Sequence, residues 1–578
     1  MTAVLLLLAA AVATASPSPA APPPPPEHGH ATATVVAGSR YGAGALHRAL
    51  LGRDYRDLWT TPVEVEVLDL RRFAGGLTPT RRVGGAQTKG LGLRGADGRD
   101  YTFRSVDKDP SELLPPDLRE TLADRLLQDQ IAASHPAGAL VASEITRGAG
   151  VITTEPRLVV LPDDPALGPH RPLFAGVLGT FEEYPRPGYA GTTEIIDHEE
   201  MWKRLMAGPA DRVDAKALLR ARLVDLVLGD WDRHRKQWRW AKVPGRAEWQ
   251  PVAEDRDQAF SRYEGLVLDI GRGTQPRFQE YGPRYPGMEG LTWNGYDVDR
   301  WLLTGLEWPA WEEAARDVRG RITDDVLRRA VDRLPAAYRA RDGERLLRDL
   351  TARRNALPEA ARRYYAHLAG EVDVRTTDRH EVAEVVHAES GAVDVSVRVA
   401  DADAPFFRRR FLPGETREVR LYLASGNDRV TVRGKASGVA VRVLGGPDDD
   451  VVDDQAGGGT RVSDHEGDDR VLEGPGTSFD RAAYEAPPPP PRAPWIPPRD
   501  WGRRTIPVAW ISGGPELGVF VGGGFVTRGY AFRRHPYADK QVVRAGYATG
   551  ASAVRAEYQG ELHRENSTTS LQLLARAS

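Results

Sequence analysis

The residues best suited to chemistry lie in one run and in a loop that follows it. The run LVDLVLGDWDRHRKQWRW, residues 223–240, sets acidic and amide side chains directly after an apolar, helix-like segment. A strand-like segment, residues 249–254, then ends in two further carboxylates. Phosphoryl transfer uses such a set, because one carboxylate orients the attacking hydroxyl while an amide and a second-loop carboxylate hold Mg²⁺. The candidates are Asp232 and His234 as catalytic residues, and Gln237, Asp255 and Asp257 as metal ligands.

Residues 223–240 are also compatible with two other interpretations. An acidic helix end also occurs as a structural network of buried carboxylates, which would pair here with Arg233 and Arg256. This interpretation stays open. A calcineurin-like metallophosphoesterase would carry Gly-Asp-x-x-Asp-Arg, but Gly229 and Arg233 stand one residue too close, and the sequence has no Gly-Asn-His block. The phosphoesterase interpretation is therefore disfavoured.

The pattern Asp232-Arg233-His234-x-x-Gln237, followed by Asp255, resembles the D-R-H-x-x-N…D pattern of atypical kinases. These include phosphatidylinositol 3-kinases, HipA-type kinases and secretory-pathway kinases. The resemblance covers roughly residues 80–370 and implies ATP and Mg²⁺ as cofactors. It implies that Asp232 is the catalytic base and that Gln237 and Asp255, or Asp257, bind the metal. Gln in place of Asn and the lack of a glycine after the loop aspartate depart from the family pattern.

The same resemblance implies a phosphate-pairing cation in the first half of this region. Lys89 lies in a glycine-containing turn, residues 84–90, that could approach phosphates. Arg104 stands where these families usually carry Lys, and an arginine also binds phosphate oxygens. The remaining candidates for the nucleotide site are Lys108 in the following loop, Asp124 or Asp129 as the acidic partner of the cation, and Glu182 in a hinge, residues 181–184, beside the adenine.

The secondary-structure elements that must position these residues are predicted to be mainly strands in the first half of this domain and mainly helices in the second half. Strands are predicted at residues 101–106, 157–161 and 173–181, and helices at residues 118–131, 216–228 and across 323–368. The fold class predicted for residues 36–375 is therefore a kinase-like α+β domain.

Length and composition set the wider limits. The chain has 578 residues, 41% of them hydrophobic, with a formal net charge of −3 and no cysteine. The length predicts several domains. The charge balance disfavours nucleic acid as a partner, and the lack of cysteine excludes disulfides and thiolate chemistry.

Residues 1–15 carry an apolar run ending in Ala-Thr-Ala, which predicts a signal peptide and export to the bacterial periplasm or outer membrane. A Pro-rich linker, residues 16–35, follows.

Residues 376–486 form a second, β-rich block with Gly-Asp repeats. The motifs around Asp428, Asp449 and Asp469 recur every 20 or 21 residues, with alternating apolar segments between them. Such a period predicts a short β-solenoid or meander. Its turns resemble calcium-binding repeat turns, which predicts Ca²⁺ there, but solvated turn carboxylates would give the same pattern.

A second Pro-rich linker, residues 487–500, precedes strands of period 2 in residues 501–578. The motifs around Trp501, 518–524 and 532–538 resemble the entry to a bacterial surface-antigen type outer-membrane barrel. About three or four strands fit here, whereas a closed barrel needs at least about eight, so the predicted barrel is incomplete. A small soluble β-sheet is the alternative.

Together these features predict an exported, outer-membrane-tethered, ATP-dependent phosphotransferase that acts on a protein or small-molecule acceptor and is either active or catalytically degenerate. A non-enzymatic outer-membrane protein with a partner-binding or assembly role is the alternative, which the scarcity of ATP outside the inner membrane favours.

Overall fold

The computed structural model describes residues 31–84, 87–111, 114, 119, 121–273, 275–435, 438–488, 498–514, 518–550 and 552–577. The predicted signal peptide and parts of both Pro-rich linkers lie outside these ranges. The chain is a multidomain α+β protein with two compact units. The first comprises residues up to Arg204, Asp211–Val298 and Trp308–Tyr364, and the second comprises Leu205–Ala210, Asp299–Glu307 and the residues from Tyr365 onward. Among the residues described, no helix is both long enough and apolar enough to cross a membrane.

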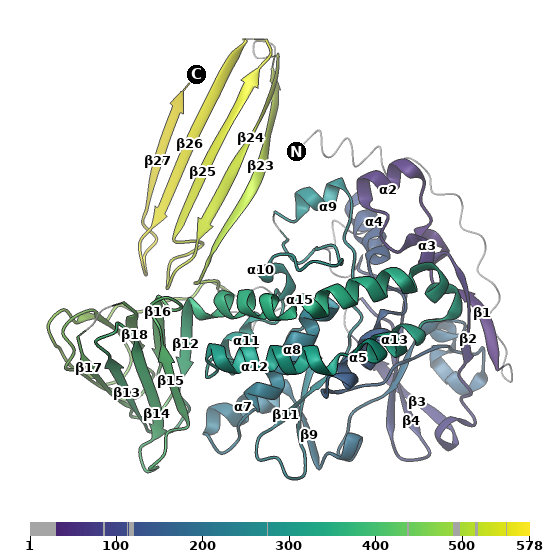
Figure 1. Ribbon diagram of the computed structural model, residues 1–578, viewed down its shortest axis with the longest axis horizontal. Helices are drawn as coiled ribbons and strands as arrows, with labels where there is room; N and C mark the ends of the chain where they lie inside the picture. Colours follow the sequence, from purple (N-terminus) through teal and green to yellow (C-terminus); the bar gives the residue numbers. More distant parts are fainter. Residues whose placement is uncertain are drawn as a thin grey trace. The chain divides into compact units, whose positions relative to one another are not determined.

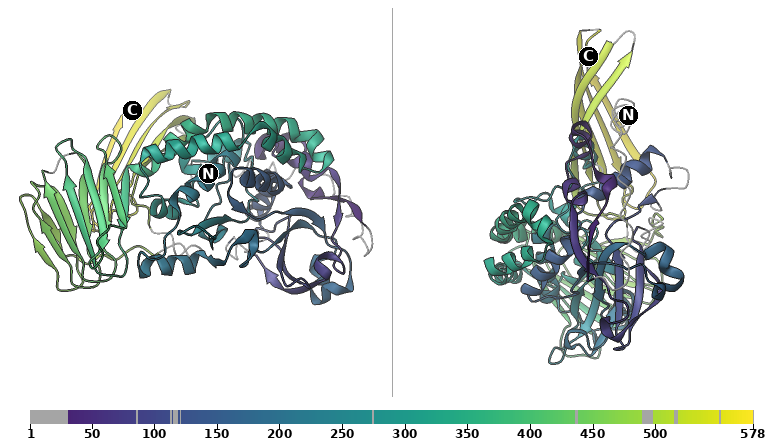
Figure 2. Two further views of the ribbon diagram at one scale, coloured as in Figure 1. Left: turned by 60° about the horizontal axis from the view of Figure 1, so that its bottom comes forward. Right: turned by 90° about the vertical axis from the view of Figure 1, so that its right-hand side faces the viewer.

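Two sheets form the framework of the first unit (Figures 1 and 2). In spatial order the larger sheet contains β1 (Thr32–Val36), β2 (Pro62–Val67), β7 (Arg157–Val160), β8 (Leu178–Glu183), β5 (Asp100–Ser105), β4 (Gly90–Gly95) and β3 (Leu77–Val83). The smaller sheet contains β6 (Ile152–Thr153), β11 (Gln250–Ala253), β10 (Trp238–Lys242) and β9 (Glu194–Asp197). Apolar side chains of the larger sheet, such as Leu91, Phe103 and Phe181, form one fully buried cluster. Burial of these side chains is the main driving force for this layer.

The helices cover the sheets and form a separate layer, in which α12 packs on α8 (Figure 1). In chain order the helices are α2 (Ala45–Leu51), α3 (Arg56–Trp59), α4 (Leu122–Asp129), α5 (Gly138–Gly148), α6 (Arg171–Phe174), α7 (His198–Ala207), α8 (Ala215–Leu228), α9 (Leu266–Gly271), α10 (Met288–Leu291), α11 (Tyr296–Leu302), α12 (Trp308–Arg321), α13 (Asp324–Asp332), α14 (Ala336–Tyr338) and α15 (Glu344–Ala369).

Helix α8 delivers the candidate catalytic residues. Asp214 caps its N-terminus by accepting the backbone N–H of Ala217 at 2.9 Å. The helix ends at Gly229, whose φ of +66° lies in the left-handed region. A Cβ there would also lie 2.7 Å from the Tyr281 ring, so this position requires glycine. After the turn at Gly229 the chain continues into the loop that carries Asp232.

The second unit begins with a β-solenoid of two sheets (Figure 1). One sheet contains β12 (Glu371–Arg375), β16 (Glu418–Tyr422), β18 (Ala440–Leu444), β20 (Thr460–Ser463) and β22 (Ser478–Asp480). The other contains β15 (Phe407–Phe411), β14 (Val393–Val399), β13 (Glu381–His387), β17 (Arg429–Gly434), β19 (Val451–Asp454) and β21 (Arg470–Leu472). Successive coils pair in parallel, as in β16 with β18 and β17 with β19, so the predicted repeat is a solenoid and not a meander. Valines from both sheets fill its interior.

Five antiparallel strands end the chain as a single layer (Figure 2). They are β23 (Arg503–Gly514), β24 (Gly518–Gly529), β25 (Asp539–Ala548), β26 (Ala553–His563) and β27 (Ser570–Ala577). Five strands are present where the sequence predicted three or four.

Other boundaries also differ from the sequence prediction. The strand predicted at residues 173–181 begins only at Leu178, because Arg171–Phe174 form α6 after two prolines. The first unit ends at Tyr364 and not at residue 375, because β12 pairs with β16 of the solenoid. The predicted helix at residues 118–131 is shorter and spans Leu122–Asp129, followed by a 3₁₀ turn.

Candidate functional site

A cavity in the first unit brings five of the predicted site residues together. Its walls come from β5, β8, the N-terminal part of α5 and the loop after β11. The predicted residues that line it are Arg104, Lys108, Glu182, Asp255 and Asp257. The cavity is therefore polar and charged where the loop after β11 meets β5 and β8.

Asp255 and Asp257 form a pair of interacting carboxyl groups in this cavity. Burial raises the pKa of Asp255 to about 6, and the negative charge of Asp257 acts in the same direction. Burial also acts to raise the pKa of Asp257, but the Lys108 ammonium outweighs it and holds that pKa below its usual range. Asp255 adopts a left-handed backbone conformation, with a φ of +50°. A metal-binding role for Asp255 and Asp257 stays a prediction.

Two cations in the cavity each have a carboxylate partner. The Lys108 ammonium forms an ion pair with Asp257. Burial alone would lower the pKa of Lys108, but the Asp257 and Asp255 carboxylates raise it. Arg104 donates from Nη1 to Glu182 Oε1 at 2.5 Å. Burial raises the pKa of Glu182, against the effect of this arginine.

The loop after α8 carries three further predicted residues, Asp232, His234 and Gln237, which are not among those lining the cavity. Asn294 donates from Nδ2 to Asp232 Oδ1. His234 accepts the backbone N–H of Lys236 at Nδ1, at 3.2 Å, and thereby caps a 3₁₀ turn. Gln237 ends that turn with a buried side chain, and its carbonyl accepts the backbone N–H of Glu254 at 3.1 Å. A metal-binding role for Gln237 and a catalytic role for His234 stay predictions.

The Arg233 side chain links the loop after α8 to the loop after β11 through hydrogen bonds. Its Nη1 donates to the carbonyls of Glu254 at 2.7 Å and Asp255 at 3.2 Å. Its Nη2 donates to the Gln237 carbonyl at 3.0 Å, and its Cζ lies 4.6 Å from the centroid of the Trp238 ring. One buried guanidinium thus binds three carbonyls from two loops, which holds them at a constant separation.

A buried ion network lies behind these loops, as one of the sequence interpretations expected, and it contains Asp230 of the predicted helix end together with Asp225. Asp225 pairs with Arg222 at 2.6 Å and also contacts Arg233 and Arg256. Asp230 lies 3.4 Å from Arg256 Nη1, and burial raises its pKa to about 7. The arginines of the motif therefore pair with Asp225 and Asp230, and their bonds to the second loop go to its backbone.

Two predicted nucleotide-site residues are not among those lining the cavity. Lys89 is exposed, and its backbone pairs with Ser105 of β5 through an N–H bond to the Ser105 hydroxyl at 3.1 Å. Asp129 was predicted to pair with the phosphate-binding cation, but it accepts two bonds from Arg56, at 2.6 and 2.8 Å, and contacts His47 at 3.0 Å. Helix α4 therefore presents Asp129 to α2 and α3, and the acid that pairs with Arg104 in the cavity is Glu182 of β8.

Sequence reasoning missed Asn294, Asp225 and the bridging role of Arg233. Asn294 precedes α11 and is separated by 62 residues from the aspartate that it contacts. No local pattern marks such a residue. Asp225 could have been noticed as an acid inside an otherwise apolar helix, which is a position that requires a buried cation.

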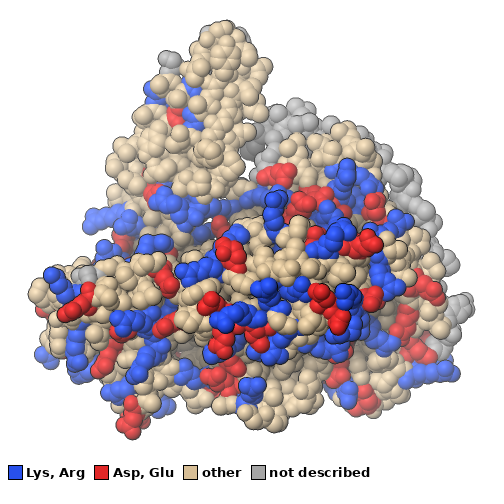
Figure 3. All heavy atoms as spheres, in the orientation of Figure 1, with Lys and Arg blue, Asp and Glu red and all other residues tan. Residues whose placement is uncertain are grey.

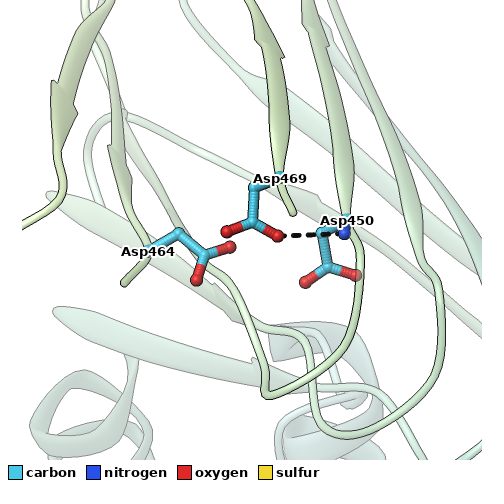
Figure 4. Close-up of side chains that lie close together, drawn as sticks. All are labelled: Asp450, Asp464 and Asp469. Carbon is cyan, nitrogen blue, oxygen red and sulfur yellow. Dashed lines mark hydrogen bonds between the residues drawn. The ribbon is translucent and has the colours of Figure 1, made fainter. Parts of the chain in front are cut away.

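A second group of acids lies in the solenoid. Asp450, Asp464 and Asp469 each offer a carboxylate oxygen within 4.8 Å of the others (Figure 4). The Asp469 carboxylate accepts the backbone N–H of Asp450 at 3.0 Å, and the Asp450 carboxylate accepts that of Asp428 at 2.8 Å. The aspartates thus form a ladder from coil to coil, which accounts for their spacing without an ion. Calcium at these turns stays a prediction.

No protein-family model and no curated protein sequence matches the chain. Solved structures that align with it include the Helicobacter pylori proinflammatory kinase CtkA, at 13% identity over 49% of this chain and 93% of that chain, with a TM-score of 0.27. Another is HipA of a Shewanella oneidensis MR-1 toxin–antitoxin complex, at 11% identity over 49% of this chain and 67% of that chain, with a TM-score of 0.27. Both are weak structural neighbours, so the function proposed below rests on this chain's own side chains.

Proposed function

We propose that the first unit is a nucleotide- and Mg²⁺-dependent phosphotransferase. The observation that carries the proposal is that Arg233 joins the loop of Asp232 to the loop of Asp255 and Asp257, beside a cavity that also contains Lys108 and Arg104. These groups are a proton acceptor, a pair of metal-binding acids and two phosphate-binding cations. Phosphoryl transfer uses groups of these kinds.

The donor set fits a divalent cation. Asp255 and Asp257 supply hard carboxylate oxygens, and their mutual repulsion is part of what raises the pKa of Asp255 to about 6. A bound Mg²⁺ would relieve this repulsion and neutralise phosphate charge as it develops. Lys108 and Arg104 lie within the same cavity and are suited to bind phosphate oxygens.

In the proposed reaction the acceptor hydroxyl oxygen attacks the terminal phosphorus of the nucleoside triphosphate. A new P–O bond forms, the bond to the bridging oxygen breaks, and the nucleoside diphosphate leaves with that electron pair. Asp232 takes the proton of the hydroxyl. Asn294 holds Asp232 Oδ1, which leaves Oδ2 to face the acceptor. Such a positioned base contributes on the order of 10²–10⁴ in rate.

The test is binding of nucleotide with and without Mg²⁺, measured by calorimetry on the full chain. Wild type should bind ATP only with Mg²⁺, and Asp257→Asn should weaken this binding at least about tenfold by removing an anionic metal ligand. Asp325→Asn, an exposed acid of α13, is the matched control. Absence of Mg²⁺-dependent binding by wild type would instead favour the non-enzymatic alternative, a partner-binding or assembly role.

We also propose that β23–β27 tether the chain to a membrane, which for an exported bacterial protein is the outer membrane. Ile511, Val521, Tyr547 and Val554 oppose one another in one row across four strands and are 47–63% exposed. The opposite face carries the row Arg544, Glu557 and Arg576, joined by ion pairs. Figure 3 shows these strands with a broad uncharged surface, whereas charges of both signs are interspersed over the rest of the visible face. An apolar face that backs onto a polar face is typical of strands that contact lipid.

A further inference from the structure

One arginine, Arg277, lies over the ring of Trp231, the residue before Asp232, and has no anionic partner among the residues that the structure describes. The Cζ atom of Arg277, which lies between α9 and α10, is 5.2 Å from the centroid of the Trp231 ring and 5.0 Å from that of Phe278. Among the residues that the structure describes, Arg277 forms no ion pair, and its buried Nε has no hydrogen-bond acceptor. A buried N–H group without an acceptor is costly, so its persistence calls for an explanation.

Two other arginines of this segment have acidic partners. Arg272 donates to the Phe278 carbonyl at 2.7 Å and pairs with Asp269 at 2.7 Å. Arg262 forms an ion pair with Glu264. Arg262 also lies over an aromatic ring, with its Cζ 5.7 Å from the centroid of Tyr55, so among the described residues Arg277 differs from these two arginines in lacking an ion pair.

The rings place Arg277 next to the proposed catalytic base. Trp231 directly precedes Asp232, and its ring centroid lies 6.4 Å from that of Tyr263, which in turn lies 4.9 Å from that of Phe278. Burial raises the pKa of the Tyr263 phenol, the positive charge of Arg277 lowers it and the negative charge of Asp232 raises it. Both charges thus lie near enough to act on the same hydroxyl group.

We propose that Arg277 binds an anionic group of the phosphoryl acceptor; this inference rests on the function proposed above. The planar guanidinium matches a carboxylate or a phosphate through paired N–H bonds, and the aromatic stack holds it in position for such a ligand. The acceptor would then be a hydroxyl compound that carries a carboxylate or phosphate close to the reacting oxygen. Asp232 would contact its hydroxyl while Arg277 contacts its anionic group.

The experiment measures binding of two simple probes, inorganic phosphate and acetate, to the full chain by calorimetry in separate titrations. At least one should bind wild type, and the stronger of the two identifies the anionic group. Arg277→Gln should weaken that binding about tenfold or more, the loss expected for a charge-assisted hydrogen bond. Arg277→Lys keeps the positive charge but lacks the paired N–H donors of the guanidinium, so its affinity for the probe should lie between those of wild type and Arg277→Gln. Arg284→Gln, at an exposed arginine, should bind as wild type does.

Several outcomes would overturn this inference. They are failure of wild type to bind either probe, unchanged binding by Arg277→Gln, and an equal loss in Arg284→Gln, which would indicate only the general positive charge of the surface. Binding of ADP with Mg²⁺ is measured on the same variants and should not change. Failure of wild type to bind that nucleotide would count against the phosphotransferase, independently of the result for Arg277.

Discussion

The Lys108 ammonium is paired with the Asp257 carboxylate, and the two residues are 149 positions apart in the sequence. The pair joins the loop after β5 to the loop after β11. It also places the strongest candidate for a phosphate-binding lysine directly on a candidate metal ligand. Gln258 donates from Nε2 to the other Asp257 oxygen at 3.1 Å, so both oxygens of this acid are oriented.

Lys108→Met should destabilise the first unit by about 3 kcal/mol, because it leaves Asp257 next to Asp255 without its cation. The double variant Lys108→Met/Asp257→Asn should recover most of this loss, since it removes the unpaired charge as well. Urea unfolding of both variants measures the difference, and Lys203→Met, at an exposed lysine, serves as the control. A double variant that is no more stable than Lys108→Met would contradict the importance of this pair.

Asp232→Asn should lower kcat for phosphoryl transfer at least about 100-fold while nucleotide affinity stays unchanged, because a base acts on the acceptor in the transition state. Asn294→Ala should lower kcat less, about tenfold, because it frees the carboxylate to rotate but leaves it in place. Steady-state kinetics and nucleotide titrations separate the two effects. Equal turnover by Asp232→Asn and wild type would show that Asp232 is not the base.

Arg233→Lys should cost about 3 kcal/mol in the free energy of unfolding. A lysine keeps the charge, but it cannot reach the Glu254, Asp255 and Gln237 carbonyls together as the guanidinium fork does. Chemical denaturation measures the loss, and Arg246→Lys, at an exposed turn, should be neutral. Nucleotide affinity should fall in parallel, since the two loops would no longer be held together.

The solenoid should lose stability as the pH rises from about 4 to 8. Burial raises the pKa of Asp428 to about 8 and that of Glu381 to about 7. The folded state therefore holds these protons more tightly than the unfolded state, so it is favoured at low pH and loses this advantage as each group ionises. Asp428→Asn keeps the oxygen that accepts the Glu381 N–H and cannot ionise. Calorimetry of the full chain at pH 5 and pH 8 should show a smaller difference for this variant than for wild type.

Two adjacent residues of β27 test the membrane tether. Leu573 shares its face with Val543 and Phe525, whereas Gln572 lies on the opposite face. Leu573→Asp should weaken co-sedimentation with phosphatidylethanolamine–phosphatidylglycerol vesicles about tenfold, and Gln572→Asp should have little effect. If both variants sediment as wild type does, the apolar face does not contact lipid.

Local patterns predicted much of this protein correctly. The period of residues 216–228 predicted α8, the 20- or 21-residue repeat predicted the solenoid, and alternation in residues 501–578 predicted extended strands. The motif spacing also predicted that acids following α8 and β11 lie in neighbouring loops. These features depend on residues close together in the chain. There the order of apolar and polar residues directly shows the period of a helix or a strand.

The sequence by itself thus determined the elements and the acids of the candidate site, whereas only the tertiary structure decided which charges meet. Asp129 pairs with Arg56, Glu182 with Arg104, and Asn294 holds Asp232. The number of turns and loops between such residues leaves many pairings compatible with the same local pattern. The pairing realised is one in which these buried charges reach partners once the apolar faces of the sheets and helices have packed, and that condition applies to the whole fold at once.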